Sequence, residues 1–117
     1  MYDFHTHTLL SDGALLPAEL LRRMQVLGYS VVGITDHVDA SNILQTLQSL
    51  ERVSKSAEHM GIRLICGVEI THVPPSEIPE LALYAKNNGA EIVVVHGESP
   101  VEPVMPGTNH AAASCPH

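Results

Sequence analysis

The sequence predicts an α/β fold in which parallel strands alternate with helices. Three observations support this prediction. Short apolar segments begin about 30 residues apart, and most of them are followed by a segment with helical periodicity. Each apolar segment also ends on a histidine or a glutamate. Because the carboxyl ends of parallel strands open on the same side of a sheet, these polar residues are expected to share one crevice.

The first two strands enclose a helix. Residues 2–8 form the first expected strand, and Pro17 opens a helix at a favoured first-turn position. Leucine and methionine side chains recur at helical spacing up to Gly28, a residue type that commonly ends a helix. The second strand is expected over residues 30–35, which are rich in β-branched side chains.

The second helix has the clearest pattern in the chain. Its apolar side chains form one unbroken stripe from Ile43 to Met60, and Gly61 follows. A nearly continuous apolar run then predicts a strand over residues 62–70 that is covered on both faces. After a pair of prolines, a third helix is expected over residues 79–88 and a fourth strand over residues 91–95.

The alternating pattern ends after the fourth strand. Residues 99–107 contain three prolines and are expected to form a loop, and residues 108–114 could begin a further helix. A closed βα barrel needs about seven or eight strands and commonly roughly 200 residues or more. We therefore expect residues 1–117 to be a single domain that corresponds to the N-terminal half of a barrel, truncated after the fourth strand.

The composition is that of a globular protein. The 117 residues are 44% hydrophobic and carry a net charge of −7, which argues against non-specific binding to nucleic acid or an anionic membrane. No signal peptide opens the sequence and no apolar run could span a bilayer, so a cytoplasmic protein is expected. The two cysteines, Cys66 and Cys115, indicate no disulfide framework, and Cys66 is expected to be a buried thiol.

The first candidate metal ligands form a His-x-His pair. His5 and His7 are expected on the same face of the first strand, because alternate side chains of a strand share a face. Such a pair can chelate a zinc, manganese or iron ion through ring nitrogens. The alternative interpretation is a pair of solvated histidines near the N-terminus, and the position at a strand end favours the metal site.

Further candidate ligands follow the later strands. Glu69 ends an apolar strand, where an unpaired carboxylate would be destabilising, and one carboxylate can bridge two cations. His37 and His96 end their strands in the same way. Asp12 lies in an Asp-Gly dipeptide that either forms a simple turn or folds the carboxylate over the site. Asp36 is expected to orient a ligand or to hold this loop.

Five short motifs resemble, in order and spacing, those of the PHP (polymerase and histidinol phosphatase) domain family. They are His5-Thr6-His7, Ser11-Asp12-Gly13, Thr35-Asp36-His37, Gly67-Val68-Glu69 and Val95-His96-Gly97-Glu98. The resemblance runs from residue 2 to about residue 110. It implies a distorted seven-stranded barrel with up to three divalent metal ions at its C-terminal mouth. A later histidine motif and an Asp-x-His pair of the family have no counterpart in this sequence.

The resemblance also implies residue roles. The implied metal ligands are His5, His7, Asp12, His37, Glu69 and His96. The two histidines of the first motif would bind one metal ion, Asp12 and His37 a second, and His96 a third, with Glu69 as the bridge. Zinc, manganese and iron are the expected metals. Glu69, His37 and Asp12 are the residues expected to be catalytic.

The activity that the resemblance implies is hydrolysis of a phosphomonoester, such as histidinol phosphate, by metal-activated water. The expected partner is a small phosphorylated substrate. One alternative is a catalytically incomplete fragment that serves as a structural or interaction half-barrel and self-associates through an exposed sheet edge. Another is a PHP domain associated with a nuclease or a polymerase. The negative charge and the 3% aromatic content argue against a nucleic-acid partner.

Overall fold

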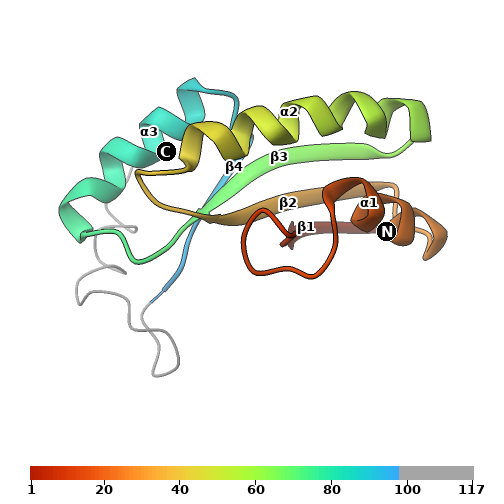
Figure 1. Ribbon diagram of the computed structural model, residues 1–117, viewed down its shortest axis with the longest axis horizontal. Helices are drawn as coiled ribbons and strands as arrows, with labels where there is room; N and C mark the ends of the chain where they lie inside the picture. Colours follow the sequence, from red (N-terminus) through yellow and green to blue (C-terminus); the bar gives the residue numbers. More distant parts are fainter. Residues whose placement is uncertain (98–117) are drawn as a thin grey trace.

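A computed structural model describes residues 1–97, and these form one parallel sheet flanked by helices (Figure 1). The elements are β1 (Tyr2–Thr6), α1 (Pro17–Val26), β2 (Val31–Val38), α2 (Ile43–Met60), β3 (Arg63–Ile70), the 3-10 turn η1 (Pro75–Glu77), α3 (Ile78–Asn87) and β4 (Ile92–Val95). The strand order is β1-β2-β3-β4, and every neighbouring pair is parallel. The α/β prediction is confirmed, since these strands and helices form a half-barrel. The expected loop over 99–107, the expected helix over 108–114 and Cys115 lie outside the described residues.

The helices begin and end where the sequence indicates. Pro17 is the first residue of α1, and Gly28 follows that helix with a φ of 97°. The bounds of α2 match the expected stripe, and Gly61 ends the helix in the left-handed conformation with a φ of 80°. Glycine adopts this conformation without the steric penalty that a Cβ atom introduces. No helix within residues 1–97 is long and apolar enough to cross a membrane.

The strands differ from the prediction mainly at their carboxyl ends. β1 stops at Thr6, two residues before the expected end. β2 continues three residues beyond its expected end at Thr35, because the pairing with β3 extends through His37 opposite Glu69 and Val38 opposite Ile70. This longer ladder fixes the two candidate ligands side by side on neighbouring strands. The turn η1 was not expected, and α3 begins one residue before its predicted start.

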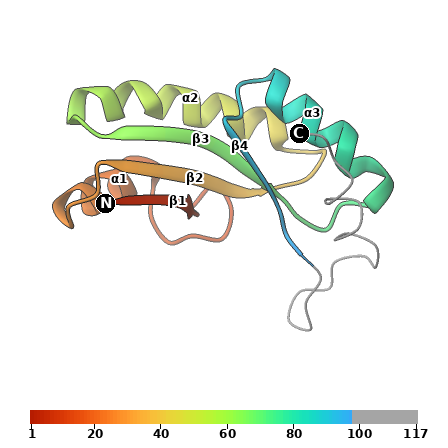
Figure 2. The same cartoon turned by 180° about the vertical axis from the view of Figure 1, so that it is seen from behind.

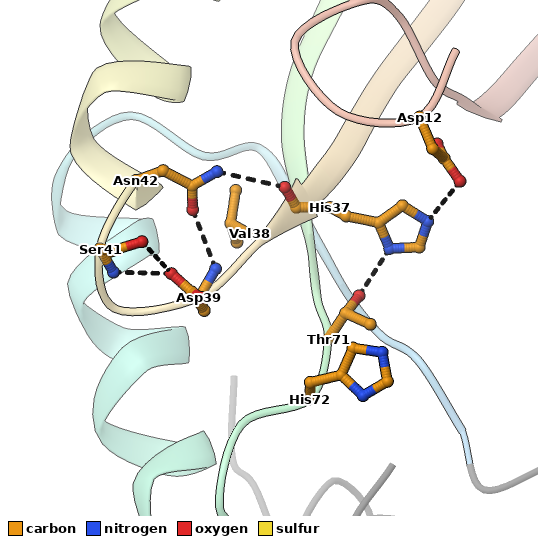
Figure 3. Close-up of a pocket in the computed structure, with 8 residues that line it drawn as sticks. All are labelled: Asp12, His37, Val38, Asp39, Ser41, Asn42, Thr71 and His72. Atoms are coloured by element: carbon orange, nitrogen blue, oxygen red, sulfur yellow. Dashed lines mark hydrogen bonds and ion pairs between the residues drawn. The ribbon is translucent and has the colours of Figure 1, made fainter. Parts of the chain in front are cut away.

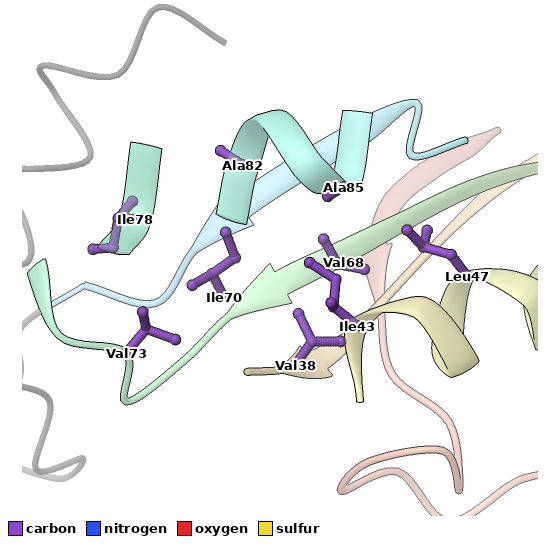
Figure 4. Close-up of a cluster of buried hydrophobic side chains, with 9 residues drawn as sticks. All are labelled: Val38, Ile43, Leu47, Val68, Ile70, Val73, Ile78, Ala82 and Ala85. Atoms are coloured by element: carbon purple, nitrogen blue, oxygen red, sulfur yellow. The ribbon is translucent and has the colours of Figure 1, made fainter. Parts of the chain in front are cut away.

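One face of β2 and β3 packs against the helices. The residues of these strands that belong to the hydrophobic core are Val32, Ile34, Val38, Leu64, Cys66, Val68 and Ile70. All of them occupy even-numbered positions, as expected when alternate side chains share a face. One group packs with residues of α1 and α2, and the other packs with residues of α2 and α3 (Figure 4). Figure 2 shows from behind how α2 extends along β3.

The odd-numbered positions face the other side of the sheet and carry the candidate site. Thr35, His37, Gly67 and Glu69 lie here, and a Cβ atom added to Gly67 would be 2.6 Å from the carbonyl oxygen of Ile92 and 2.9 Å from the Thr35 methyl group. Glycine therefore allows β3 and β4 to approach closely just below Glu69. In the described sheet β4 is an edge strand, and its four residues are half-buried.

Candidate metal centre

The carboxyl ends of the strands bring the predicted ligands together around Glu69. This carboxylate is buried at the end of β3. Its Oε1 contacts the ring Nε2 of His5 and lies 3.1 Å from Nε2 of His7. Its Oε2 lies 2.8 Å from Nδ1 of His96 and 3.5 Å from Nδ1 of His37. The residues therefore share one crevice, as expected. The contacts with the histidines compensate for the cost of burying the Glu69 carboxylate.

Asp12 closes the centre from the β1–α1 loop. Its Oδ1 lies 2.9 Å from Nδ1 of His7, and its Oδ2 lies 3.1 Å from Nε2 of His37. The alternative of a simple surface turn does not account for these two contacts. The loop folds the carboxylate back over the strand ends, so that Asp12 contacts His7, which follows β1, and His37 of β2 on the solvent side, opposite the buried Glu69.

Asp36 holds the loop that carries Asp12. Its side chain is fully buried on the even-numbered face, opposite His37. Oδ1 accepts hydrogen bonds from the backbone N–H of Thr8 (2.6 Å) and from the Ser11 hydroxyl (2.6 Å), and Oδ2 accepts one from the Thr8 hydroxyl (2.7 Å). Of the two roles expected for Asp36, the structure supports the second, since its hydrogen bonds fix the loop.

Thr71 orients His37, a role that was not expected from the sequence. The Thr71 hydroxyl lies 2.6 Å from Nδ1 of His37 and donates to the backbone carbonyl of Glu69 (3.2 Å). Because its only hydroxyl proton goes to that carbonyl, its oxygen accepts from Nδ1–H, and this contact fixes the ring so that Nε2 faces Asp12. The signal in the sequence was the spacing, since a residue two positions after Glu69 shares its face.

The histidines keep both carboxylates of the centre ionised. Burial by itself raises the pKa of Glu69, but hydrogen bonds from His96 and His5 and the nearby His37 outweigh it, so that its pKa lies below the ordinary value of 4.5. For Asp12, burial again raises the pKa, and the electrostatic effects of His37 and His7 outweigh it and lower the pKa below 3.8. Two anionic carboxylates among imidazole nitrogens are a suitable donor set for a divalent cation.

The donor atoms fall into three adjoining groups. They are His5, His7 and Glu69; His7, Asp12 and His37; and His37, Glu69 and His96, with the donor atoms of each group within 4.8 Å of one another. Two donors that share a four-coordinate ion about 2.0 to 2.2 Å away lie roughly 3.4 Å apart, so these spacings fit metal coordination. The pairings implied by the resemblance are all present. The structure adds His7 to the second group and His37 to the third.

A pocket of about 340 Å³ opens beside Asp12 and His37 (Figure 3). Residues of the β2–α2 connection, including Asp39 and Asn42, line one side of it. Thr71 and His72 follow β3 and line the other side. The Asp39 carboxylate accepts a hydrogen bond from the backbone N–H of Ser41 (2.7 Å). The hydrogen bonds from the Ser41 hydroxyl and backbone lower the pKa of Asp39 below its usual value. Because Asp12 and His37 line this pocket and also belong to the second donor group, the pocket is continuous with the candidate metal centre.

Comparison with known proteins identifies the family of this chain. The family model described as PHP domain matches residues 3–96, which include every candidate ligand. The chain belongs to the PHP domain family. The residues of all three donor groups lie within the matched range of this PHP domain.

Similar curated proteins include longer chains. An uncharacterized protein of Methanocaldococcus jannaschii is 49% identical over 114 residues, which are 96% of this chain and 52% of that protein. A 5'-3' exoribonuclease of Haemophilus influenzae is 37% identical over 70 residues, 60% of this chain and 23% of the enzyme. The 5'-3' exoribonuclease Rnm of Escherichia coli is 37% identical over 73 residues, 62% of this chain and 23% of the enzyme. This PHP domain therefore spans about half, or less, of the length of these relatives.

The family assignment and the donor groups agree on the general chemistry. PHP domains are metal-dependent and belong to a hydrolytic family that includes the exoribonucleases. The described residues of this PHP domain supply histidine nitrogens and carboxylate oxygens in three groups that could hold metal ions. These observations indicate a metal-dependent hydrolase family.

Proposed function

We propose that this PHP domain hydrolyses a phosphomonoester, with histidinol phosphate as the first substrate to test. The observation that carries the proposal is the sharing of donors between neighbouring groups. His7, His37 and Glu69 each belong to two groups, so metal ions held there would be close neighbours. Neighbouring cations are the arrangement that suits phosphoester hydrolysis, because both attacking and leaving oxygens need charge stabilisation.

Different residues of the chain would hold the metal ions and orient their ligands. The buried Glu69 and the Asp12 of the exposed loop would help hold metal ions, since each contacts histidines from more than one donor group. Thr71 would keep Nε2 of His37 available as a ligand. When bound, zinc, manganese or iron would neutralise charge on the phosphate oxygens and lower the pKa of a water molecule. Glu69, His37 and Asp12 are accordingly proposed as the catalytic residues.

A nuclease is the second candidate function, because the relatives from Haemophilus influenzae and Escherichia coli carry the name 5'-3' exoribonuclease. A third candidate is a structural half-barrel that associates with a second copy through the edge of β4. The half-buried state of that edge strand supports this possibility. The three candidates predict different substrates or none, which makes them separable.

The test is hydrolysis of histidinol phosphate, a hexose phosphate and a 5'-phosphorylated RNA oligonucleotide by the purified chain with added Mn²⁺, Zn²⁺ or Fe²⁺. We expect phosphate release from a monoester that a chelator abolishes and that Glu69→Gln reduces by at least about 100-fold. Glu58→Gln is the matched control, because Glu58 is exposed on α2 and the change removes the same charge. Cleavage of the oligonucleotide alone would favour the nuclease. A metal-loaded chain that hydrolyses nothing and self-associates would favour the structural role.

A further inference from the structure

The pocket beside the metal centre is the first part of a longer groove. It shares Asp12 and His37 with the second donor group. A second pocket of about 270 Å³ continues from it, and Glu77 belongs to its lining. The residues common to the two pockets are Asp39, Ser41 and His72. A ligand anchored at the metal centre would therefore extend between the β2–α2 connection and the β3–η1 connection (Figure 3).

Three carboxylates are spaced along this groove. Asp12 lies at the metal end, Asp39 lies where the pockets meet, and Glu77 lies at the far end. Within residues 1–97, no lysine or arginine lines either pocket. An anionic group would therefore be favoured at the metal centre and disfavoured further along the groove, since like charges repel more strongly near a protein surface than in bulk water.

Asp39 is fixed in this position by its neighbours. Its Oδ1 accepts hydrogen bonds from the hydroxyl and the backbone N–H of Ser41, and its own N–H donates to Oδ1 of Asn42 (2.9 Å). The side chain is exposed, so a ligand can reach it. Across the groove, His72 has a φ of 58°, a left-handed conformation that is uncommon for a residue with a Cβ atom. Both walls therefore have defined local structures.

We propose that this groove binds the organic part of the substrate and that Asp39 determines specificity by disfavouring a second phosphate there. The preferred substrates would be phosphomonoesters of alcohols without a further anionic group. This inference rests on the proposed function for the placement of the first phosphate at the metal centre. It adds a residue that selects among phosphoesters and that belongs to none of the three donor groups.

The test compares glucose 6-phosphate with glucose 1,6-bisphosphate, which differ by one phosphate. On the full chain with saturating Mn²⁺, the KM for phosphate release is measured for each sugar, or the dissociation constant by titration calorimetry where no phosphate is released. Asp39→Asn keeps an oxygen that can accept the Ser41 hydrogen bonds and removes the charge. We expect it to change the ratio of the two constants about fivefold in favour of the bisphosphate, and the change should shrink at high salt. Glu58→Gln, which removes a charge outside the groove, should leave the ratio as in the wild type.

An unchanged ratio in Asp39→Asn, an equal change in Glu58→Gln, or the absence of binding by both sugars would overturn the proposal. Thermal unfolding of each variant shows whether the fold is retained. Ser41→Ala provides a second variant, which removes the hydroxyl hydrogen bond to Asp39 but keeps both the backbone N–H donor and the charge of the carboxylate. Ser41→Ala should still prefer glucose 6-phosphate over the bisphosphate, as the wild type does. Hydrolysis is measured on the same preparations. A charge-dependent ratio without hydrolysis would contradict the proposed function and leave the specificity assignment standing.

Discussion

Asp36 accepts hydrogen bonds from both the backbone N–H and the hydroxyl of Thr8, at 2.6 and 2.7 Å. Thr8 directly follows His7, and both Thr8 and Asp36 are fully buried. The pair therefore ties the end of β1 to β2 at the base of the loop that carries Asp12. A hydrogen-bonded carboxylate of this kind fixes a metal-binding loop without itself being a ligand.

We predict that Asp36→Ala lowers the free energy of unfolding by about 3 kcal/mol, because it leaves buried donors of Thr8 without an acceptor. Thr8→Val removes the hydroxyl, which donates to Asp36 and accepts from the backbone N–H of Leu10 (3.1 Å), and should cost about 1 kcal/mol. Metal affinity should fall by about 10- to 100-fold in Asp36→Ala, since Asp12 loses its fixed position. Urea denaturation and metal titration measure the two effects. Equal destabilisation by the two variants, or undiminished metal affinity, would contradict this role.

Glu69→Gln tests the centre through its metal content. The amide keeps the shape of the side chain and removes the charge that four imidazole rings surround. We expect the variant to retain less than about a tenth of the wild-type metal after dialysis against a weak chelator. Atomic emission spectroscopy gives the metal per chain, and Glu58→Gln is again the control. Equal metal content in Glu69→Gln and the wild type would mean that Glu69 is not a ligand.

Cys66 should be a poorly reactive thiol. It is 8% exposed, and burial, followed by the effects of Glu91 and Glu51, raises its pKa from 9.0 to about 11. In a Cys115→Ser background, we expect modification by a disulfide reagent at pH 8 to be at least about 100-fold slower in the folded chain than in denaturant. Rapid modification of the folded chain would show that β3 is accessible on its helix side.

The raised pKa of Cys66 makes the free energy of unfolding depend on pH. Because the folded pKa is raised, the contribution of Cys66 is fully present below pH 9, and it is lost as the pH rises towards 11. Cys66→Ala in the Cys115→Ser background removes this titration. The difference in free energy of unfolding between the two chains should therefore narrow between pH 9 and pH 11. Urea denaturation across that range measures it, and a constant difference would contradict the raised pKa.

Gly67→Ala should strain the contact between β3 and β4. The new Cβ atom would meet the backbone of Ile92 at 2.6 Å, and a backbone carbonyl cannot rotate away as a flexible side chain can. We expect a loss of about 2 kcal/mol in the free energy of unfolding. Gly61→Ala is the matched control, because nothing lies within 4 Å of its added Cβ and only its φ of 80° is unfavourable. Weaker metal binding in Gly67→Ala alone would show that the strand spacing positions the donors.

The sequence was most informative where one periodic pattern decides the structure. The stripe of α2 and the glycine after it determine both ends of that helix, and the prediction for Ile43–Met60 is confirmed. Strand ends were less predictable, because β2 extends to Val38 only through its pairing with β3. The motif order indicated which side chains would converge. Periodicity could not indicate that His7 and His37 would each belong to two donor groups, since that depends on the path of a loop.

Residue type alone also did not indicate the contacts of the small hydroxyl residues. Thr71 contacts His37, and Thr8 and Ser11 contact Asp36, through single hydroxyl groups. Threonine and serine occur in many turns and strand ends, so their residue type alone does not distinguish an orienting role from a solvated one. The groove beside Asp39 could not be predicted from the sequence either, because it forms between two connections that are distant in the sequence.

Asp36 and His37 are adjacent in the chain, yet one anchors a loop on the helix side of the sheet and the other faces the donor groups. Insertion or deletion of a single residue in β2 ahead of them would exchange the two side chains between the faces. Both the loop anchor and the candidate ligand would then be lost together. During divergence, the length of this strand should therefore be far less variable than its apolar composition.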